Sequence, residues 1–179
     1  MVIEKDISRV FGIRQAEGKD VPVLIQFLAN LALHVNGGPP QNLKQEEQDR
    51  LAESLRTGLA DPDCLLLVAE TSGAKLVGMG YLSIVRNHGI WEGAGNLELT
   101  VGVIDDVWVE PDFRNMGVFS ALMGELVTFA DAQGVRELML EYSTSNREAE
   151  AAWAGLGFKP TGVRAAAPTE TVRQALSRR

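Results

Sequence analysis

The chain has 179 residues, of which 45% are hydrophobic and 23% are charged, and its formal net charge is −7. This length suits one globular domain, and this composition argues against a disordered or fibrous chain. The negative net charge argues against nucleic acid as a partner, because such binding depends on Lys and Arg side chains that neutralise phosphates. The acidic excess favours solubility and also suits a cationic substrate.

The sequence shows no feature of a membrane, secreted or metal-binding protein. Apolar runs such as Leu65–Ala69 fall far short of the roughly 20 residues that a spanning helix needs. The acidic start, Met1–Asp6, lacks the basic and apolar regions of a signal peptide. The chain has one cysteine, Cys64, and two histidines, His34 and His88, which argues against a disulfide or a zinc site. We therefore expect a cytoplasmic protein that has no membrane contact and binds no metal.

Periodicity and turn residues predict two helices after a short first strand. The strand covers residues 10–14, and Asp20 is expected to cap the first helix, with Pro22 in its first turn. Gly37–Pro40 stop this helix, and a second helix runs over 45–59.

The pattern then changes to strands, with a helix on each side of one of them. In chain order we expect strands over 65–69, 76–85 and 97–109, a helix over 117–133, a strand over 137–142, a helix over 146–155 and a strand over 158–166 that leads into a polar tail. This order combines antiparallel hairpins with one strand–helix–strand crossover. It predicts an α+β fold around a mixed sheet.

The stretch from Ile104 to Gly117 predicts an anion site. A strand ends at Glu110-Pro111, and a short loop leads directly into the helix that starts at Gly117. The N–H groups of such a helix start and the helix dipole favour a phosphate. Gly117 allows close backbone approach and Arg114 adds a charged donor. An ordinary strand-to-helix turn is equally compatible with these residues, and the loop lacks the Lys-Ser/Thr ending of a P-loop.

Downstream spacing links this loop to a known family. After the next strand come Asn146, Ala149, Trp153 and Gly157-Phe158. Together with Val107-Trp108-Val109-Glu110-Pro111 and Arg114-Asn115-Met116-Gly117, this spacing resembles the GNAT superfamily of N-acetyltransferases. The matched stretch covers about a third of the chain, and the flanking helices and strands fall in the order that this family uses.

The resemblance implies a GNAT fold with a mixed central sheet, splayed fourth and fifth strands and flanking helices. It implies a single domain over 1–179, with the core motif at 104–158 and an extended tail at 163–179. It also implies acetyl transfer from acetyl-CoA, which acts as cosubstrate, to the amine of an acceptor. The cofactor-binding residues that it implies are Val107, Trp108 and Val109 for the pantetheine arm, Arg114, Asn115, Met116, Gly117, Val118 and Phe119 for the pyrophosphate, and Asn146 and Trp153 beside the arm.

Three positions qualify these assignments. Phe119 stands where the family has a small residue, which is tolerable if the ring points into the core. Trp153 stands where the family often has a tyrosine general acid, and an indole N–H cannot act as that acid. Asn146 has a second interpretation as a helix cap, a role for which Ser145 and Glu148 also form a capping-box pattern.

Asp105 is the best candidate for the general base, because it precedes the expected thioester-binding triplet by two residues. Asp106 points to the opposite face if the strand is regular, although a bulge would change this. Glu98 and Glu141 are weaker candidates, more simply interpreted as solvated or ion-paired carboxylates. Tyr142, which we expect at the end of the fifth strand, is the candidate acid for the departing thiolate.

Other reactive residues have simpler interpretations. Cys64 fits a buried, inert thiol, and Tyr81 fits a half-buried core aromatic. His88 and Trp91 line the acceptor pocket or belong to an exposed loop without a substrate role.

Two other functions compete with the acetyltransferase hypothesis. One is a catalytically weak regulatory domain that binds acyl-CoA. This alternative is favoured because Trp153 stands where the family often has its tyrosine acid. The other is a nucleotide-binding module that uses the same loop for ATP or NAD. The tail is hard to bury within one subunit, and we expect a homodimer. The sequence carries no motif that identifies the acceptor amine.

Overall fold

The structure, a computed structural model, describes residues 11–36, 43–86, 100–162 and 166–177. The chain divides into two compact units, Met1–Glu141 and Tyr142–Arg179. The first unit contains β1 (Phe11–Gln15), η1 (Gly18–Asp20), α1 (Val21–Asn36), α2 (Gln45–Ala60), β2 (Cys64–Thr71), β3 (Leu76–Arg86), β4 (Thr100–Val109), η2 (Pro111–Phe113), α4 (Val118–Ala132) and β5 (Glu137–Leu140). The second unit contains α5 (Arg147–Gly155) and α6 (Thr169–Ser177).

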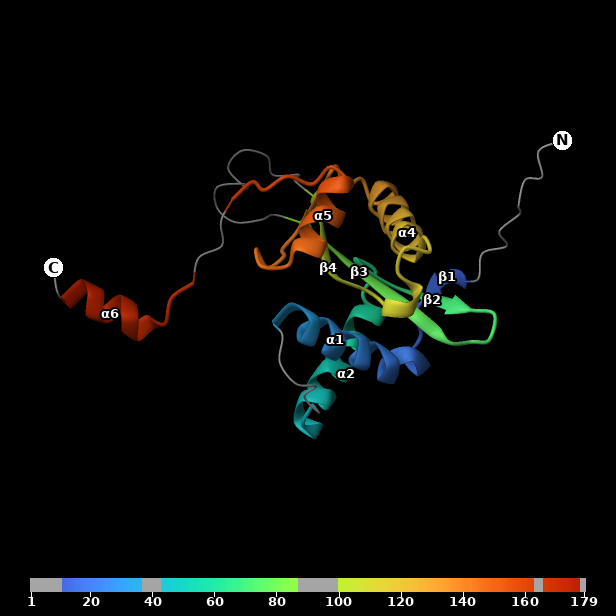
Figure 1. Ribbon diagram of the computed structural model, residues 1–179, viewed down its shortest axis with the longest axis horizontal. Helices are drawn as coiled ribbons and strands as arrows, with labels where there is room; N and C mark the ends of the chain where they lie inside the picture. Colours follow the sequence, from blue (N-terminus) through green and yellow to red (C-terminus); the bar gives the residue numbers. More distant parts are fainter. Residues whose placement is uncertain (1–10, 37–42, 87–99, 163–165, 178–179) are drawn as a thin grey trace. The chain divides into compact units, whose positions relative to one another are not determined.

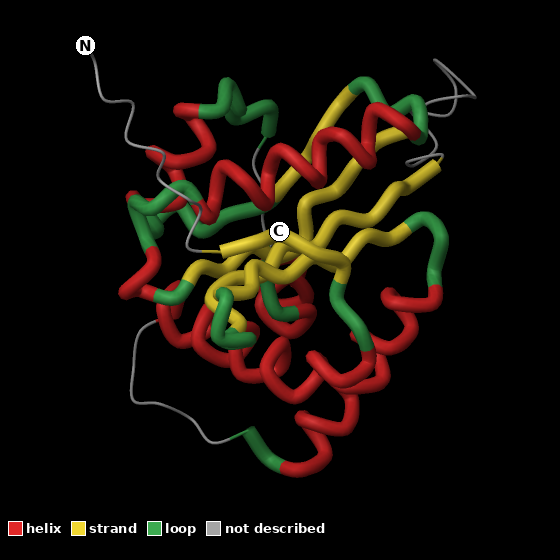
Figure 2. Tube along the Cα trace, turned by 90° about the vertical axis from the view of Figure 1, so that its right-hand side faces the viewer, coloured by secondary structure: helices red, strands yellow, loops and turns green. Residues whose placement is uncertain are grey.

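The first unit is built on a five-stranded mixed sheet in the order β1-β2-β3-β4-β5. The pairs from β1 to β4 are antiparallel, and β4 pairs with β5 in parallel. A parallel pair needs a crossover, which α4 provides. Helix α4 covers one face of the sheet, and α1 and α2 cover the other (Figures 1 and 2). This arrangement confirms the predicted α+β fold.

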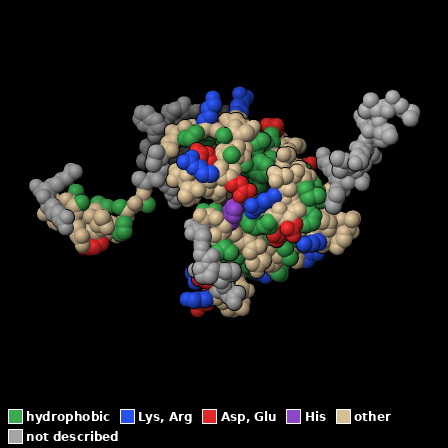
Figure 3. Space-filling view, in the orientation of Figure 1, with side chains coloured by type: hydrophobic (Ala, Val, Ile, Leu, Met, Phe, Trp, Pro, Cys, Tyr) green, Lys and Arg blue, Asp and Glu red, His purple; other side chains and the backbone are tan. Residues whose placement is uncertain are grey.

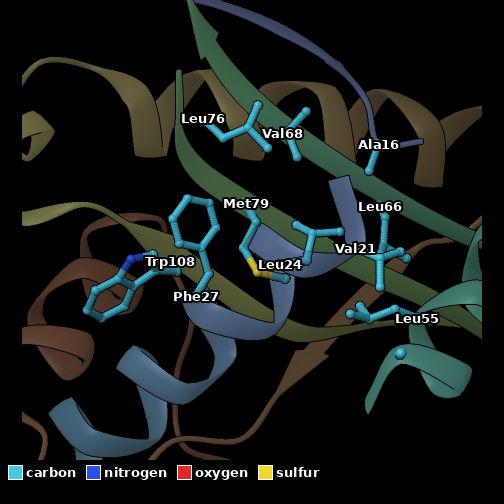
Figure 4. Close-up of a cluster of buried hydrophobic side chains, with 11 residues drawn as sticks. Ala16, Val21, Leu24, Phe27, Leu55, Leu66, Val68, Leu76, Met79 and Trp108 are labelled. Atoms are coloured by element: carbon cyan, nitrogen blue, oxygen red, sulfur yellow. The ribbon is translucent and has the colours of Figure 1, made fainter. Parts of the chain in front are cut away.

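The core on the α1 and α2 face joins these helices to three strands (Figure 4). Leu24 and Phe27 of α1 are fully buried there, with Met79 of β3. Trp108 of β4 and Leu55 of α2 belong to the same cluster. This packing places the side chain of Trp108 on the α1 face of the sheet.

On the opposite face of the sheet, the close packing of α4 depends on two glycines of β3, Gly78 and Gly80. A Cβ atom at Gly78 would lie 3.0 Å from the backbone oxygen of Trp108 and 3.1 Å from Cγ1 of Val118. A Cβ atom at Gly80 would lie 3.2 Å from Cδ1 of Leu126. The two glycines therefore let α4 lie close against the strand that borders β4.

An ionic network fixes the entry to α1. Arg14 donates two hydrogen bonds to Asp20, at 2.7 and 3.0 Å, and one to Glu70 at 2.5 Å. Asp20 is buried and also accepts from the backbone N–H of Glu17. The prediction that Asp20 caps the first helix is wrong, because its carboxylate is engaged by Arg14 and by the turn of η1. Pro22 lies in the first turn of α1 as predicted.

The C-terminal predictions are confirmed only in part. Gly134, with φ of 74°, ends α4 as predicted. Strand β5 stops at Leu140, so Tyr142 lies beyond the strand rather than at its end. Residues 158–162 and 166 form no strand, and 163–165 lie outside the described residues. Helix α6 forms where a polar tail without secondary structure was expected.

Candidate active site

The edge of β4 is the first element of the site. On one side β4 pairs with β3 as far as Val109, which lies opposite Gly78. On the other side its ladder with β5 covers only Val101–Ile104. From residue 105 to 109, therefore, no strand among the described residues pairs with this edge of β4. An unpaired strand edge presents backbone N–H and C=O groups that can pair with an added extended ligand.

The loop after β4 forms the second element. Asn115 and Gly117 have φ of 60° and 85°, in the left-handed region. Gly117 is the N-cap of α4, and a Cβ atom placed there would meet nothing within 4 Å. Ala121 donates the first bond of the helix, to Gly117, at 3.0 Å. The amides before Ala121 thus begin a 15-residue helix at an exposed glycine, an arrangement that suits an anion.

The side chains of this loop divide into buried and exposed ones. Val118 is buried in the core, Phe119 is half-buried, and Met116 is 48% exposed. Arg114 donates from Nε to the Val109 carbonyl at 3.2 Å. This bond holds the loop against the end of β4 and places a guanidinium group beside the site.

A bulge in β4 decides where the two aspartates lie. Asp106 is opposite Tyr81 and Ile104 is opposite Leu82, so Asp105 is the extra residue. The hydroxyl of Ser83 donates to Oδ2 of Asp105 at 2.7 Å. Because Ser83 and Tyr81 share one face of β3, both carboxylates lie on that face. A regular strand would place Asp106 on the opposite face from Asp105, and the bulge, the alternative that the sequence left open, brings the two together.

Both carboxylates ionise less readily than a free aspartate. Removal from water raises the pKa of Asp105, which the hydrogen bond from Ser83 partly opposes. The pKa of Asp106 is raised by burial and by the charge of Asp105. Asp105 is exposed and Asp106 is half-buried, and adjacent carboxylates with raised pKa values are a recurring feature of functional sites.

Tyr81 and Cys64 lie on the same side of the sheet. The Tyr81 hydroxyl donates to Sγ of Cys64 at 3.4 Å, and Gly58 of α2 leaves space for that hydroxyl. Burial raises the pKa of Tyr81 and also that of Cys64. A thiol with a raised pKa is protonated at neutral pH, which agrees with the interpretation of Cys64 as a nonreactive residue.

Three predicted site residues belong to the second unit. Asn146 caps α5, with Oδ1 accepting from the Ala149 N–H at 3.0 Å, and this leaves its amide nitrogen available as a donor. Ser145 bonds to Ser143 instead of forming the capping box. The ring of Trp153 packs edge-on against Phe158, with 5.6 Å between centroids. That Tyr142, Asn146 and Trp153 approach β4 stays a prediction.

Two residues of the site, His34 and Ser83, were not predicted from the sequence. His34 of α1 packs edge-on against Trp108, with 6.0 Å between ring centroids. The Arg114 guanidinium lies 5.1 Å from the centroid of the same indole. The space-filling view shows a histidine (purple) beside basic side chains (blue) (Figure 3). Ser83, the partner of Asp105, was also missed. Contacts between α1, β3 and β4 create these roles, and no local motif marks them.

The remaining predictions concern the other candidate residues, metal binding and membrane-spanning helices. Glu98, His88 and Trp91 lie outside the described residues, and Glu141 is exposed just beyond β5. Within the described ranges no three His, Cys, Asp or Glu side chains gather as a metal site. No helix in those ranges has the length and apolar character that crossing a membrane requires.

Comparison with known proteins identifies the family and the fold of the chain. The sequence model of the acetyltransferase (GNAT) family matches residues 30–158, more than half of the chain. The chain therefore belongs to the GNAT acetyltransferase family. A search of the curated proteins gives no match.

Solved structures from several organisms share the fold. A predicted acetyltransferase with acetyl-CoA from Clostridium acetobutylicum superposes with a TM-score of 0.71 at 17% identity, covering 88% of this chain and 96% of that chain. An aminoglycoside antibiotic 6'-N-acetyltransferase from Acinetobacter baumannii gives 0.66 at 17%, covering 88% and 97%. Glucosamine-6-phosphate N-acetyltransferase from Arabidopsis thaliana gives 0.63 at 21%, covering 88% and 97%. These likenesses establish a GNAT fold.

Proposed function

We propose that this chain is an N-acetyltransferase that moves the acetyl group of acetyl-CoA to a primary amine of a small molecule or peptide. The observation that carries the proposal is the unpaired edge of β4 from 105 to 109, which leads directly to the glycine-capped start of α4. A thioester cosubstrate with an extended amide arm and a pyrophosphate needs both features. Two of the structures that share the fold are N-acetyltransferases, and another is described with acetyl-CoA.

The first unit offers a place for each part of the cosubstrate. Main-chain groups of Val107–Val109 pair with the pantetheine arm as an added strand would. Amides from Arg114 to Phe119 hold the pyrophosphate, and Gly117 permits its close approach. Asn146 and Trp153 are the further residues proposed for the arm, with the amide nitrogen of Asn146 as donor. Both units act as one domain in this proposal, as the sequence predicts.

The reaction is a direct transfer without an acyl-enzyme. The neutral amine attacks the thioester carbonyl, the new C–N bond forms, and the C–S bond breaks. Asp105, through a water molecule, first takes a proton from the ammonium form of the acceptor. After the attack the Tyr142 hydroxyl protonates the departing thiolate and regains a proton from the new amide nitrogen. The face that carries Asp105 and Asp106 is negatively charged, so it attracts the ammonium form of the acceptor and provides the base that makes it neutral.

The proposal is tested by measuring acetyl transfer directly. The full chain is incubated with acetyl-CoA and a panel of amines, including polyamines, amino acids, aminoglycosides and peptide N-termini. Release of the coenzyme A thiol is followed, and products are identified by mass. We expect at least one acetylated amine with saturable kinetics. Tight acetyl-CoA binding without transfer to any amine would contradict the enzyme and support the acyl-CoA-binding regulatory domain.

Tyr142→Phe examines the proposed acid. We expect its turnover to fall about 10²–10⁴-fold, with the acetyl-CoA affinity unchanged. Trp153→Phe is the matched comparison, because both changes alter one aromatic residue of the second unit. Normal turnover of Tyr142→Phe would show that a water molecule, or no acid, serves the thiolate.

A further inference from the structure

The indole nitrogen of Trp108 is the unusual atom of the site. The side chain is only 6% exposed, and Nε1 is buried without a hydrogen-bond partner among the described residues. It is the one buried side-chain nitrogen or oxygen atom of the described chain in this condition. Buried donors in folded proteins nearly always have an acceptor, so an unmatched one calls for a specific explanation.

The core does not require this nitrogen. Trp108 lies at the end of its hydrophobic cluster, beside Phe27 (Figure 4). A phenylalanine at the same position would supply aromatic surface without burying an unmatched donor. The unmatched N–H group at the boundary of the core therefore points to an acceptor that arrives with a ligand.

The position of the indole separates the two substrates. The pantetheine arm, as proposed above, pairs with main-chain groups in the plane of the sheet. The Trp108 side chain leaves that plane toward α1, where it contacts His34. Asp106 precedes Trp108 by two residues on the same strand and lies on the same face. The α-carbons of such residues are roughly 7 Å apart. The indole and the two carboxylates thus lie on the same face of the sheet.

We propose that Trp108 determines acceptor specificity by donating its indole hydrogen bond to an oxygen atom of the acceptor. The preferred acceptors are amines that carry a hydroxyl or carbonyl oxygen a few bonds from the amino group. In this arrangement Asp105 and Asp106 bind the amino group of the acceptor, and the indole N–H of Trp108 donates a hydrogen bond to its oxygen atom. This inference rests on the proposed N-acetyltransferase function and adds the substrate class to it.

The kinetic test uses matched amines that differ in one oxygen. Ethanolamine is compared with propylamine, and 3-amino-1-propanol with butylamine, for the full chain and for Trp108→Phe. We expect the wild type to have the higher kcat/KM for the oxygen-bearing member of at least one pair. Trp108→Phe should reduce that preference about 2- to 10-fold, the range of one neutral hydrogen bond.

A binding test observes the N–H group directly. In the presence of coenzyme A, which permits no turnover, ¹⁵N-labelled protein is titrated with each amine. The Trp108 indole signal is the one that Trp108→Phe lacks. If that variant does not fold, Trp91→Phe and Trp153→Phe assign the signal by elimination. We expect the Trp108 signal to shift downfield with ethanolamine or 3-amino-1-propanol and not with their alkyl partners.

The outcomes separate this inference from the function on which it rests. Absence of transfer to every amine would overturn the N-acetyltransferase itself. An active enzyme whose preference is the same with and without the indole would overturn the role of Trp108 alone. Equal shifts of the Trp108 signal with both members of each pair would do the same.

Discussion

Asp105 is the residue on which the proposed chemistry depends most. Its carboxylate accepts a hydrogen bond from Ser83 at 2.7 Å, and its pKa is raised by removal from water. Only the ionised form accepts a proton, so the wild-type rate should fall as the pH drops through this raised pKa. A carboxylate with a raised pKa is a more effective general base near neutral pH than an ordinary carboxylate.

Replacing this base should therefore change the pH profile. We expect Asp105→Asn to lower turnover about 10²–10⁴-fold, most strongly at low pH, with partial recovery at high pH where more amine is neutral. The measurement is kcat/KM for the amine from acid to alkaline pH. Asp131→Asn on the exposed surface of α4 is the matched control. A profile for Asp105→Asn that parallels the wild type at every pH would exclude Asp105 as the base.

Asp106 makes a complementary prediction about stability. Its pKa is raised by burial and by Asp105. A carboxyl group whose folded pKa exceeds its unfolded pKa binds its proton more tightly in the folded state. Its ionisation therefore lowers the free energy of unfolding as the pH rises through that window, and the loss persists above it.

Asp106→Asn removes this unfavourable charge. We expect it to raise Tm at neutral pH by a few degrees at most, with a gain that shrinks as the pH falls from the raised pKa of Asp106 toward the ordinary aspartate pKa and is absent below it. Thermal unfolding at several pH values, with Asp131→Asn for comparison, measures the effect. A gain that is equal at acid and neutral pH would show that the charge is not its source.

At the scale of elements, the contact between α4 and β3 holds in place the helix start that we propose binds phosphate. A Cβ atom at Gly78 would lie 3.0 Å from a backbone oxygen of β4, which cannot move as a flexible side chain can. We expect Gly78→Ala to lower the free energy of unfolding by about 1–3 kcal/mol through overpacking. Denaturant unfolding measures this loss.

Gly124 of α4 is a position where alanine should raise stability, in contrast to Gly78 of β3. It is exposed, and a Cβ atom there would meet nothing within 4 Å. Gly124→Ala should raise the free energy of unfolding by roughly 0.5–1 kcal/mol, because alanine favours a helix interior. Equal and small effects of both substitutions would mean that α4 does not pack as closely on β3 as the structure describes.

At the scale of the molecule, helix α6 carries exposed apolar residues. Leu176 is 66% exposed and Val172 is 46% exposed. We expect the chain to form a homodimer at tens of micromolar, a concentration typical of modest specific affinity. Leu176→Glu should shift it toward monomer, whereas the exposed Glu170→Gln should not. Sedimentation equilibrium measures both, and a wild type that is monomeric throughout would contradict the dimer.

Local patterns predicted most of the molecule, and non-local contacts account for the rest. The spacing of leucines predicted α2, and Gly117 and Gly134 predicted both ends of α4 within a residue or two. The bulge at Asp105 depends on register with β3, which no single strand reveals. The unmatched indole of Trp108 depends on packing between α1 and β4. Helix α6 was missed because its short, polar segment lacks an apolar run.

The residues of the candidate site also fall into those that local sequence patterns indicate and those that depend on distant contacts. The loop at Arg114 to Phe119 was predicted from a strand that leads directly into a helix at a glycine and from the spacing of the residues downstream. The structure has that helix start, with φ of 85° at Gly117, and its role in binding phosphate stays a prediction. The roles of His34 and Ser83 were not recognisable, since each arises from a neighbour distant in sequence.

Calorimetric titration with acetyl-CoA tests the central claim most directly. We predict saturable binding to the wild type, no binding of comparable strength for ATP, and no measurable binding of acetyl-CoA to Gly117→Glu. A side chain at Gly117 would fill the anion site, repel the pyrophosphate and strain a left-handed backbone. Gly124→Glu, with the same change of charge on an exposed turn of α4, should bind acetyl-CoA as the wild type does. Unaltered affinity in a folded Gly117→Glu variant, or a wild type that binds ATP in preference, would contradict the account.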